Sequence, residues 1–301
     1  MPSYLPPSAD RPAPVPSRPE LPEGVWRPEP PTPPSGRDAL PRWPLWAPFA
    51  GLLGALLVAV VGVGVITLVI ELAGVDTADD TPPAVAIGGT YVQDLGLIGM
   101  ALLLARLLDA PLTPAKFGLR LTRLRPAIGW TLLSWFIFFA FATVWGIALD
   151  ITENDDLPEE FGVDGSTVAL IAVAILVCVL APIAEELFFR GFCFTALRRA
   201  LGMLPAAILT GVIFGAIHLG SSEIEFIVPL MVFGFSLCLL YVWTDSLLPC
   251  IVLHALNNGL AFGVMQGWGA ATVPAMAAAA VLSALIVLPF ARRASGPAVA
   301  A

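Results

Sequence analysis

The chain has 301 residues, of which 57% are apolar and only 13% are charged, and its formal net charge is −8. Its mean hydropathy is +0.86, and apolar runs of about 18 or more residues recur along it, as in helical proteins that cross a bilayer several times. This composition excludes an ordinary soluble domain. Nucleic acid is excluded as a partner because no basic patch is longer than a short loop.

The first 44 residues differ in composition from the rest of the chain. Proline is frequent, five arginines are balanced by five acidic residues, and apolar periodicity is absent. Such a segment cannot bury enough apolar surface to fold, so we predict a disordered cytoplasmic tail with polyproline II character over residues 1–44. Its x-P-x-P repeats would suit an SH3-like partner, although a solvated tail is the simpler interpretation.

Residues 45–293 are predicted to form an all-α, polytopic membrane domain of about eight transmembrane helices, followed by a short tail over 294–301. The predicted spans are residues 46–71, 84–105, 127–149, 167–199, 204–220, 226–243, 247–265 and 270–290. The fourth span is the longest. Its last ten residues, from Arg190 to Arg199, are polar enough to leave the bilayer.

Basic and acidic residues alternate between the two sides of this predicted bundle. Outside the tail, all ten Lys and Arg residues lie at the end of, or after, the second, fourth and eighth spans, whereas the opposite connections are acidic. The positive-inside rule therefore predicts that both termini are cytoplasmic. The bias toward Ala, Pro and Arg favours a bacterial plasma membrane as the location.

Two adjacent carboxylates and an arginine interrupt the apolar fourth span. A charge at bilayer depth costs roughly 2.5–3.5 kcal/mol, so such residues indicate function by default. Glu186 and Arg190 are four residues apart and can neutralise each other on one helix face. Glu185 lies about 100° around the helix and has no cation at i±3 or i±4, so its partner must come from another helix or from water.

The chain contains only two histidines, and each lies in a predicted span. Glu185 lies 14 residues before Arg199, and His218 lies 13 residues after Pro205. Adjacent antiparallel helices would therefore place Glu185 and His218 at one level, about 20 Å from their shared connection. These two side chains are predicted to share a cavity.

The second histidine, His254, brings an amide with it on the seventh span. Asn258 follows His254 by four residues and so shares its helix face, and Asn257 competes for that face at i+3. The seventh span is thus predicted to contribute two polar groups to the cavity that contains Glu185 and His218.

This set of side chains suits the hydrolysis of a peptide bond. Glu185 and His218 can hold and deprotonate a water molecule, and His254 and Asn258 can donate to a developing oxyanion. The alternative is zinc bound by Glu185, His218 and His254, although the paired histidines of an H-E-x-x-H helix are absent. Phe214, four residues before His218, is interpreted as packing that supports the site.

Three motifs in chain order now identify a resemblance: Glu185-Glu186-x-x-x-Arg190, Phe214-x-x-x-His218 and His254-x-x-x-Asn258. Together they resemble the CPBP family of intramembrane endopeptidases, which includes the type II CAAX prenyl proteases and the bacteriocin-processing Abi proteins. The resemblance covers roughly residues 167–267. It implies that Glu185 and His218 activate water, that His254 and Asn258 form the oxyanion hole, and that Glu186 and Arg190 support them. We predict in addition that no metal or other cofactor is required.

The resulting prediction is a membrane endopeptidase that cleaves a membrane-associated peptide or protein and has the lipid bilayer as its other partner. Two other classes remain open. A catalytically silent scaffold or regulator of the same family would have no need for an unpaired carboxylate at depth. A proton-coupled transporter would be expected to show internal repeats and broken paired helices, which the sequence lacks.

Overall fold

The computed structural model describes residues 40–77, 81–151 and 161–295, and every regular element within these ranges is a helix. The long helices are α1 (Ala47–Leu72), α2 (Pro83–Leu108), α3 (Leu124–Ala148), α8 (Ile224–Thr244), α9 (Leu248–Met265) and α10 (Thr272–Ser295). The shorter ones are η2 (Pro114–Phe117), α4 (Thr167–Ile175), η4 (Leu176–Leu180), α5 (Ala181–Glu186), η5 (Leu187–Phe194), α6 (Thr195–Leu201), α7 (Met203–Ala216) and η6 (Gly269–Ala271). The predicted all-α class is confirmed.

Seven helices in the described ranges are long and apolar enough to cross a membrane. Helix α1 illustrates why they require lipid. Leu53, Leu57 and Val61 all point outward and are 68%, 62% and 57% exposed. A helix that is apolar on all faces and exposes most of them is stable only in a hydrocarbon environment. The chain is therefore an integral membrane protein.

The fifth predicted span, residues 204–220, corresponds to a shorter apolar helix that is not among these seven. Helix α7 has only 14 residues, about 21 Å at 1.5 Å per residue, which is shorter than the hydrocarbon core of a bilayer. It ends at Ala216 because the following residues form a tight turn. The N–H groups of Ser221 and Ser222 both bond to the His218 carbonyl, and Gly220 has φ +93°, which favours glycine. His218 therefore lies in a turn instead of on a helix.

The fourth predicted span is one continuous helical stretch, Thr167–Leu201, of 35 residues. It contains two π-helical segments, η4 and η5. The short α-helical segment between them, α5, carries Glu185 and Glu186. Pro182 has no N–H and cannot complete a regular hydrogen-bond ladder here. The wider π turns change which side chains face the interior, and such turns are frequent at functional sites.

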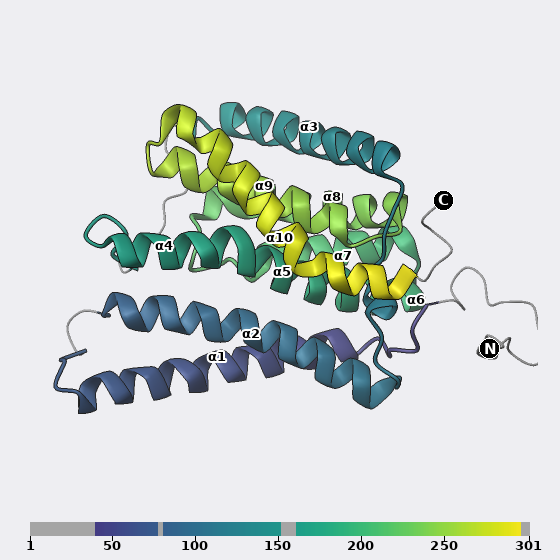
Figure 1. Cartoon of the computed structure of the whole chain (residues 1–301). Helices are drawn as coiled ribbons and strands as arrows, with labels where there is room; N and C mark the ends of the chain where they lie inside the picture. Colours follow the sequence, from purple (N-terminus) through teal and green to yellow (C-terminus); the bar gives the residue numbers. More distant parts are fainter. Residues whose placement is uncertain (1–39, 78–80, 152–160, 296–301) are drawn as a thin grey trace, which may run out of the picture. The chain divides into compact units, whose positions relative to one another are not determined.

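The described helices pack in pairs, with α1 beside α2, α7 beside α8, and α9 beside α10 (Figure 1). Small residues allow α7 and α8 to approach closely: a Cβ added at Gly211 or Gly215 would lie 2.6–2.8 Å from backbone oxygens of α8. Helix α3 packs on α8, where its Trp145 indole donates to the Glu225 carbonyl at 2.9 Å. That carbonyl lacks its usual helical donor because residue 229 is a proline.

The carboxylate-bearing helix stretch lies at the centre of these pairs. Segment α5 contacts α2 and α9, and η5 contacts α7 and α8. The aromatic side chains of η5, Phe188, Phe189, Phe192 and Phe194, are almost completely buried. This position surrounds Glu185 and Glu186 with side chains from four other helices.

Most of the predicted N-terminal tail lies outside the described residues, which begin at residue 40, and so do residues 296–301 of the predicted C-terminal tail. The prediction of disorder up to residue 44 is wrong for the last residues of the tail. Trp43 is buried, with its ring centroid 5.3 Å from that of Phe117 and 4.9 Å from that of Phe192. Arg199 also donates to the Leu40 carbonyl at 3.0 Å. An aromatic side chain flanked by prolines thus anchors the chain before α1 begins.

Candidate active site

Glu186 and Arg190 form the ion pair that their spacing predicts. Arg190 Nη1 lies 2.7 Å from Glu186 Oε1, and both side chains are fully buried. The guanidinium has two further partners: Nη2 donates to the Gly234 carbonyl of α8 at 3.0 Å, and Cζ lies 4.5 Å from the centroid of the Phe214 ring. Arg190 thereby ties the carboxylate helix to α7 and α8, and Phe214 supports it through a cation–π contact.

Glu186 has a second partner that the sequence did not reveal. His254 Nδ1 lies 2.8 Å from the same Oε1 atom that accepts from Arg190. The His254 ring is 3% exposed and is held between the rings of Phe214 and Phe233, with centroid separations of 5.8 and 5.5 Å. Because a carboxylate accepts, Nδ1 carries the proton and Nε2 is the free ring nitrogen. Glu186 therefore fixes the orientation of His254.

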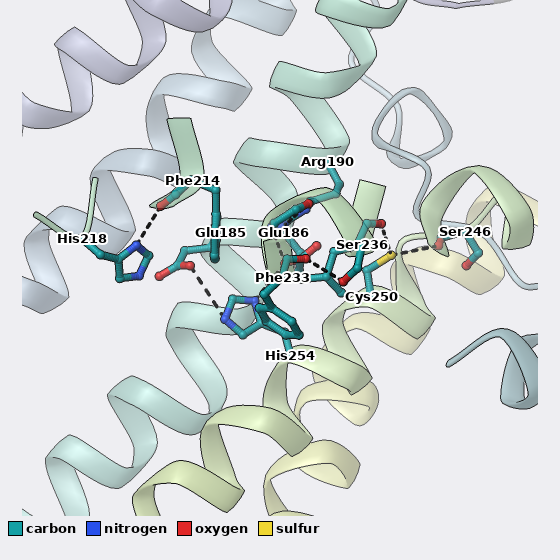
Figure 2. Close-up of polar contacts among 12 residues, drawn as sticks. Glu185, Glu186, Arg190, Phe214, His218, Phe233, Ser236, Ser246, Cys250 and His254 are labelled. Atoms are coloured by element: carbon teal, nitrogen blue, oxygen red, sulfur yellow. Dashed lines mark hydrogen bonds and ion pairs between the residues drawn. The ribbon is translucent and has the colours of Figure 1, made fainter. Parts of the chain in front are cut away.

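Glu185 is the least satisfied of the carboxylates on this helix. Its side chain is buried, and its Oε2 atom has no hydrogen-bond partner among the described residues. The Nε2 atom of His254 lies 3.8 Å from Oε2. Figure 2 shows the Glu185 carboxylate pointing into the space between the His218 and His254 rings. The partner that Glu185 requires from another helix is thus a histidine of α9.

His218 reaches this space from the turn after α7, and not from a helix. Its Nδ1 lies 2.8 Å from the Phe214 carbonyl, which fixes Nδ1 as the donor and leaves Nε2 with a lone pair. The ring packs on Phe214 at a centroid separation of 5.1 Å and is partly exposed. Phe214 thus contacts both histidine rings.

Asn258 lies one helical turn beyond His254 on α9 and contacts the π-helical segment. Its Nδ2 donates to the Val177 carbonyl at 2.9 Å. The Ala181 N–H, which would bond to Val177 in an α-helix, bonds to the Leu176 carbonyl instead, and the next residue, Pro182, has no N–H. Asn258 therefore satisfies a carbonyl that the proline leaves without a donor. One N–H of its amide group remains for another acceptor.

A further buried carboxylate belongs to this neighbourhood and was missed. Asp94 lies on α2, is 1% exposed, and interacts electrostatically with Glu185, while its Oδ2 atom has no hydrogen-bond partner in the described ranges. The sequence contained the signal, because Asp94 is an acidic residue inside the predicted span 84–105. No other polar residue in that span forms a motif with it, so local pattern does not assign Asp94 to the site.

A zinc site would require three or more ligand side chains close together. In residues 40–77, 81–151 and 161–295, no three His, Cys, Asp or Glu side chains are grouped closely enough to hold a metal ion. The three side chains of the zinc alternative, Glu185, His218 and His254, therefore do not form such a group in the described residues.

Residues 167–260 match the family model described as "Type II CAAX prenyl endopeptidase Rce1-like". This interval contains all seven of the predicted site residues and agrees with the resemblance to the CPBP family; Asp94 lies outside it. No curated protein and no solved structure matched the chain.

Proposed function

We propose that this chain, with its Rce1-like domain over residues 167–260, is an intramembrane endopeptidase that hydrolyses a peptide bond with water activated by Glu185 and His218. The observation that carries the proposal is that the Glu185 carboxylate points between two imidazoles whose hydrogen bonds differ (Figure 2). His218 presents a lone pair at Nε2, whereas the Nδ1–H of His254 is fixed by an anion.

The acceptors suit a nucleophilic water molecule. Glu185 Oε2 and His218 Nε2 are both free to accept, so one water can donate a hydrogen to each of them. The water oxygen then turns its lone pairs toward a substrate carbonyl. Transfer of one proton to Glu185 as the O–C bond forms is general-base catalysis. Glu185 is the proton acceptor, and His218 orients the water.

The donors suit the oxyanion that this attack produces. Because Glu186 accepts from Nδ1, His254 can donate from Nε2 only in its doubly protonated form. The imidazolium charge is then balanced by the carboxylates on either side, Glu186 at 2.8 Å and Glu185 at 3.8 Å. The second N–H of Asn258, one turn further along α9, supplies another donor. Donors fixed before the reaction stabilise the transition state without reorganisation.

The substrate is a membrane-associated peptide or protein. The family description names CAAX prenyl endopeptidases, and the site lies among helices that expose apolar side chains to lipid. A substrate that is anchored in the membrane could place its cleavable bond at the same depth in the bilayer as the site. Metal-free hydrolysis is part of the proposal. The experiments below test this proposal against two alternatives. One is a zinc-dependent reaction through the same residues, and the other is a non-proteolytic scaffold.

The test is cleavage of quenched fluorogenic peptides by the purified protein in liposomes. One peptide set carries a prenylated CAAX sequence, and a second carries an acyl anchor instead. Glu185→Gln should reduce kcat by about a hundredfold or more, because it removes the base and keeps the shape. Glu225→Gln, at an exposed glutamate of α8, is the matched control and should cleave as the wild type does. Full activity in Glu185→Gln would contradict the proposal.

A further inference from the structure

A cavity of about 590 Å³ lies at one end of the membrane helices, away from the carboxylate site. Its lining comes from the ends of α2 and α8, from η2 and the loop after it, from α6, and from residues 40–42 that precede α1. These segments lie on the side that the basic residues predict to be cytoplasmic. None of the residues with a proposed catalytic role lines this cavity.

The cavity carries excess positive charge. It is lined by four basic side chains, Arg42, Lys116, Arg120 and Arg198, but by only two acidic ones, Asp109 and Asp245. Each carboxylate is already paired, Asp109 with Lys116 at 3.1 Å and Asp245 with Arg120 at 2.9 Å. Arg198 has no ion-pair partner in the part of the chain that the structure describes. An anionic ligand would complete the charge balance.

The acidic residues of the cavity are committed to their present partners. Burial of Asp109 disfavours its charged form, but hydrogen bonds from the Arg42 backbone N–H and from Lys116 outweigh that effect and lower the pKa of Asp109. Its side chain is therefore charged at neutral pH and occupied. It does not compete for the guanidinium of Arg198.

Hydrogen bonds and close packing hold the lining residues of the cavity in fixed positions. Arg120 donates to the Ala115 carbonyl at 2.8 Å as well as to Asp245, and its own carbonyl accepts from Ser246 at 2.6 Å. Gly118, with φ +73°, lies against Tyr241 so closely that a Cβ would collide with the phenol ring. The basic groups are thus held in place before any ligand arrives, which reduces the entropy lost on binding.

The surroundings of the cavity indicate where the anion comes from. Leu107, Leu45 and Trp46, near the cavity at the adjoining ends of α2 and α1, are 70%, 44% and 54% exposed. Exposed leucines face lipid chains, and tryptophan is enriched where chains meet headgroups. The cavity therefore opens at the level of the headgroups, where basic pockets between helices bind anionic lipids.

We propose that this cavity binds the phosphate group of an anionic phospholipid of the cytoplasmic leaflet, with Arg198 and Arg42 as the groups that recognise the charge. A lipid headgroup and free inorganic phosphate would both present a phosphate anion to these residues. The position of the cavity at the depth of the headgroups favours the lipid. Lys116 and Arg120 complete the positive field but stay bound to Asp109 and Asp245.

The test is lipid binding by the full-length protein in detergent, followed by native mass spectrometry with dioleoyl-phosphatidylglycerol and dioleoyl-phosphatidylcholine as probes. Phosphatidylglycerol should bind about tenfold more tightly. The double variant Arg42→Gln/Arg198→Gln should lose that preference, whereas Arg198→Lys, which keeps the charge, should retain most of it. Arg125→Gln removes an exposed cation that does not line the cavity and should bind as the wild type does.

Three results would overturn the proposal. Equal losses in Arg125→Gln and in the double variant Arg42→Gln/Arg198→Gln would indicate diffuse attraction to the charged face. Equal binding of the two lipids by the wild type would show that the cavity does not distinguish an anionic headgroup from a zwitterionic one. Displacement of phosphatidylglycerol by inorganic phosphate at low millimolar concentration would make the ligand a soluble anion. Unchanged gel-filtration and circular-dichroism profiles would establish that each variant is folded.

Discussion

The substitution Glu186→Gln provides the sharpest test of how the site is held together. Glu186 Oε1 accepts from Arg190 at 2.7 Å and from His254 at 2.8 Å, and the side chain is fully buried. Removing its charge leaves the buried Arg190 cation without an anionic partner among the described residues. Breaking a buried pair in this way costs about 3–5 kcal/mol. We expect a fall in Tm on the order of 10 °C.

Activity should fall for a separate reason in the same variant. A hydrogen bond to a charged group contributes about 1.5–3 kcal/mol, so a His254 that faces a neutral amide should be about ten- to a hundredfold less effective as an oxyanion donor. Glu185→Gln should also lose kcat but should keep its Tm, because the Glu185 Oε2 atom has no hydrogen-bond partner to lose in the described ranges.

A double variant separates the two effects. In Glu186→Gln/Arg190→Met the buried cation is removed together with its anion, and replacement of a whole buried pair is often neutral for stability. Most of the lost Tm should return, while kcat stays low because His254 still lacks its carboxylate. The assays are thermal unfolding in detergent and kcat on a fluorogenic peptide in liposomes. Wild-type Tm and kcat in Glu186→Gln, or recovery of kcat in the double variant, would refute this reasoning.

Four further predictions concern the oxyanion donor, the metal, the pH dependence and the topology. Asn258→Ala should slow turnover about a hundred- to a thousandfold with KM little changed, measured by steady-state kinetics; an unaffected kcat would exclude Asn258 from the oxyanion hole. Exhaustive chelation should leave activity intact, and loss of activity that zinc restores would make the histidines metal ligands. The pKa of Asp109 is lowered through its bonds to Arg42 and Lys116, so this contact stabilises the fold above the ordinary aspartate pKa and is lost as pH falls through the lowered value; Asp109→Asn should flatten the acid side of a Tm–pH curve. A reporter after Arg293 should read as cytoplasmic and one near Asp156 as external, and the reverse result would invert the assigned orientation.

Local periodicity predicted the parts of the site that lie within a single helix. The i, i+4 rule gave the pairing of Glu186 with Arg190, because both residues belong to one helical stretch and burial leaves them no other way to neutralise. It also gave the shared face of His254 and Asn258 on α9. Apolar run length predicted seven long helices, but not the early end of α7, because the run continues through Ile217 while Gly220 and two serines close a turn.

Contacts between helices were beyond that reasoning. The bond from His254 to Glu186 joins residues 68 apart in the chain, and nothing in either local pattern indicates which of two adjacent carboxylates a distant imidazole will meet. The same applies to Asp94, whose helix carries no motif. Its place near Glu185 depends on the packing of α2 against α5.

The backbone of the long fourth helix explains how two adjacent residues can provide one structural carboxylate and one without a hydrogen-bond partner in the described ranges. Adjacent residues on a helix point about 100° apart, so Glu186 can meet Arg190 while Glu185 faces another neighbour. Pro182 and the π turns of η4 leave the Val177 carbonyl without a helical donor, and Asn258 binds it from α9. That bond fixes the position of α9 along the axis of the carboxylate helix. His254, one turn away, is thereby held where Glu186 and Glu185 both reach its ring. A residue with no N–H thus sets the register of two helices, and through it the geometry of the proposed oxyanion hole.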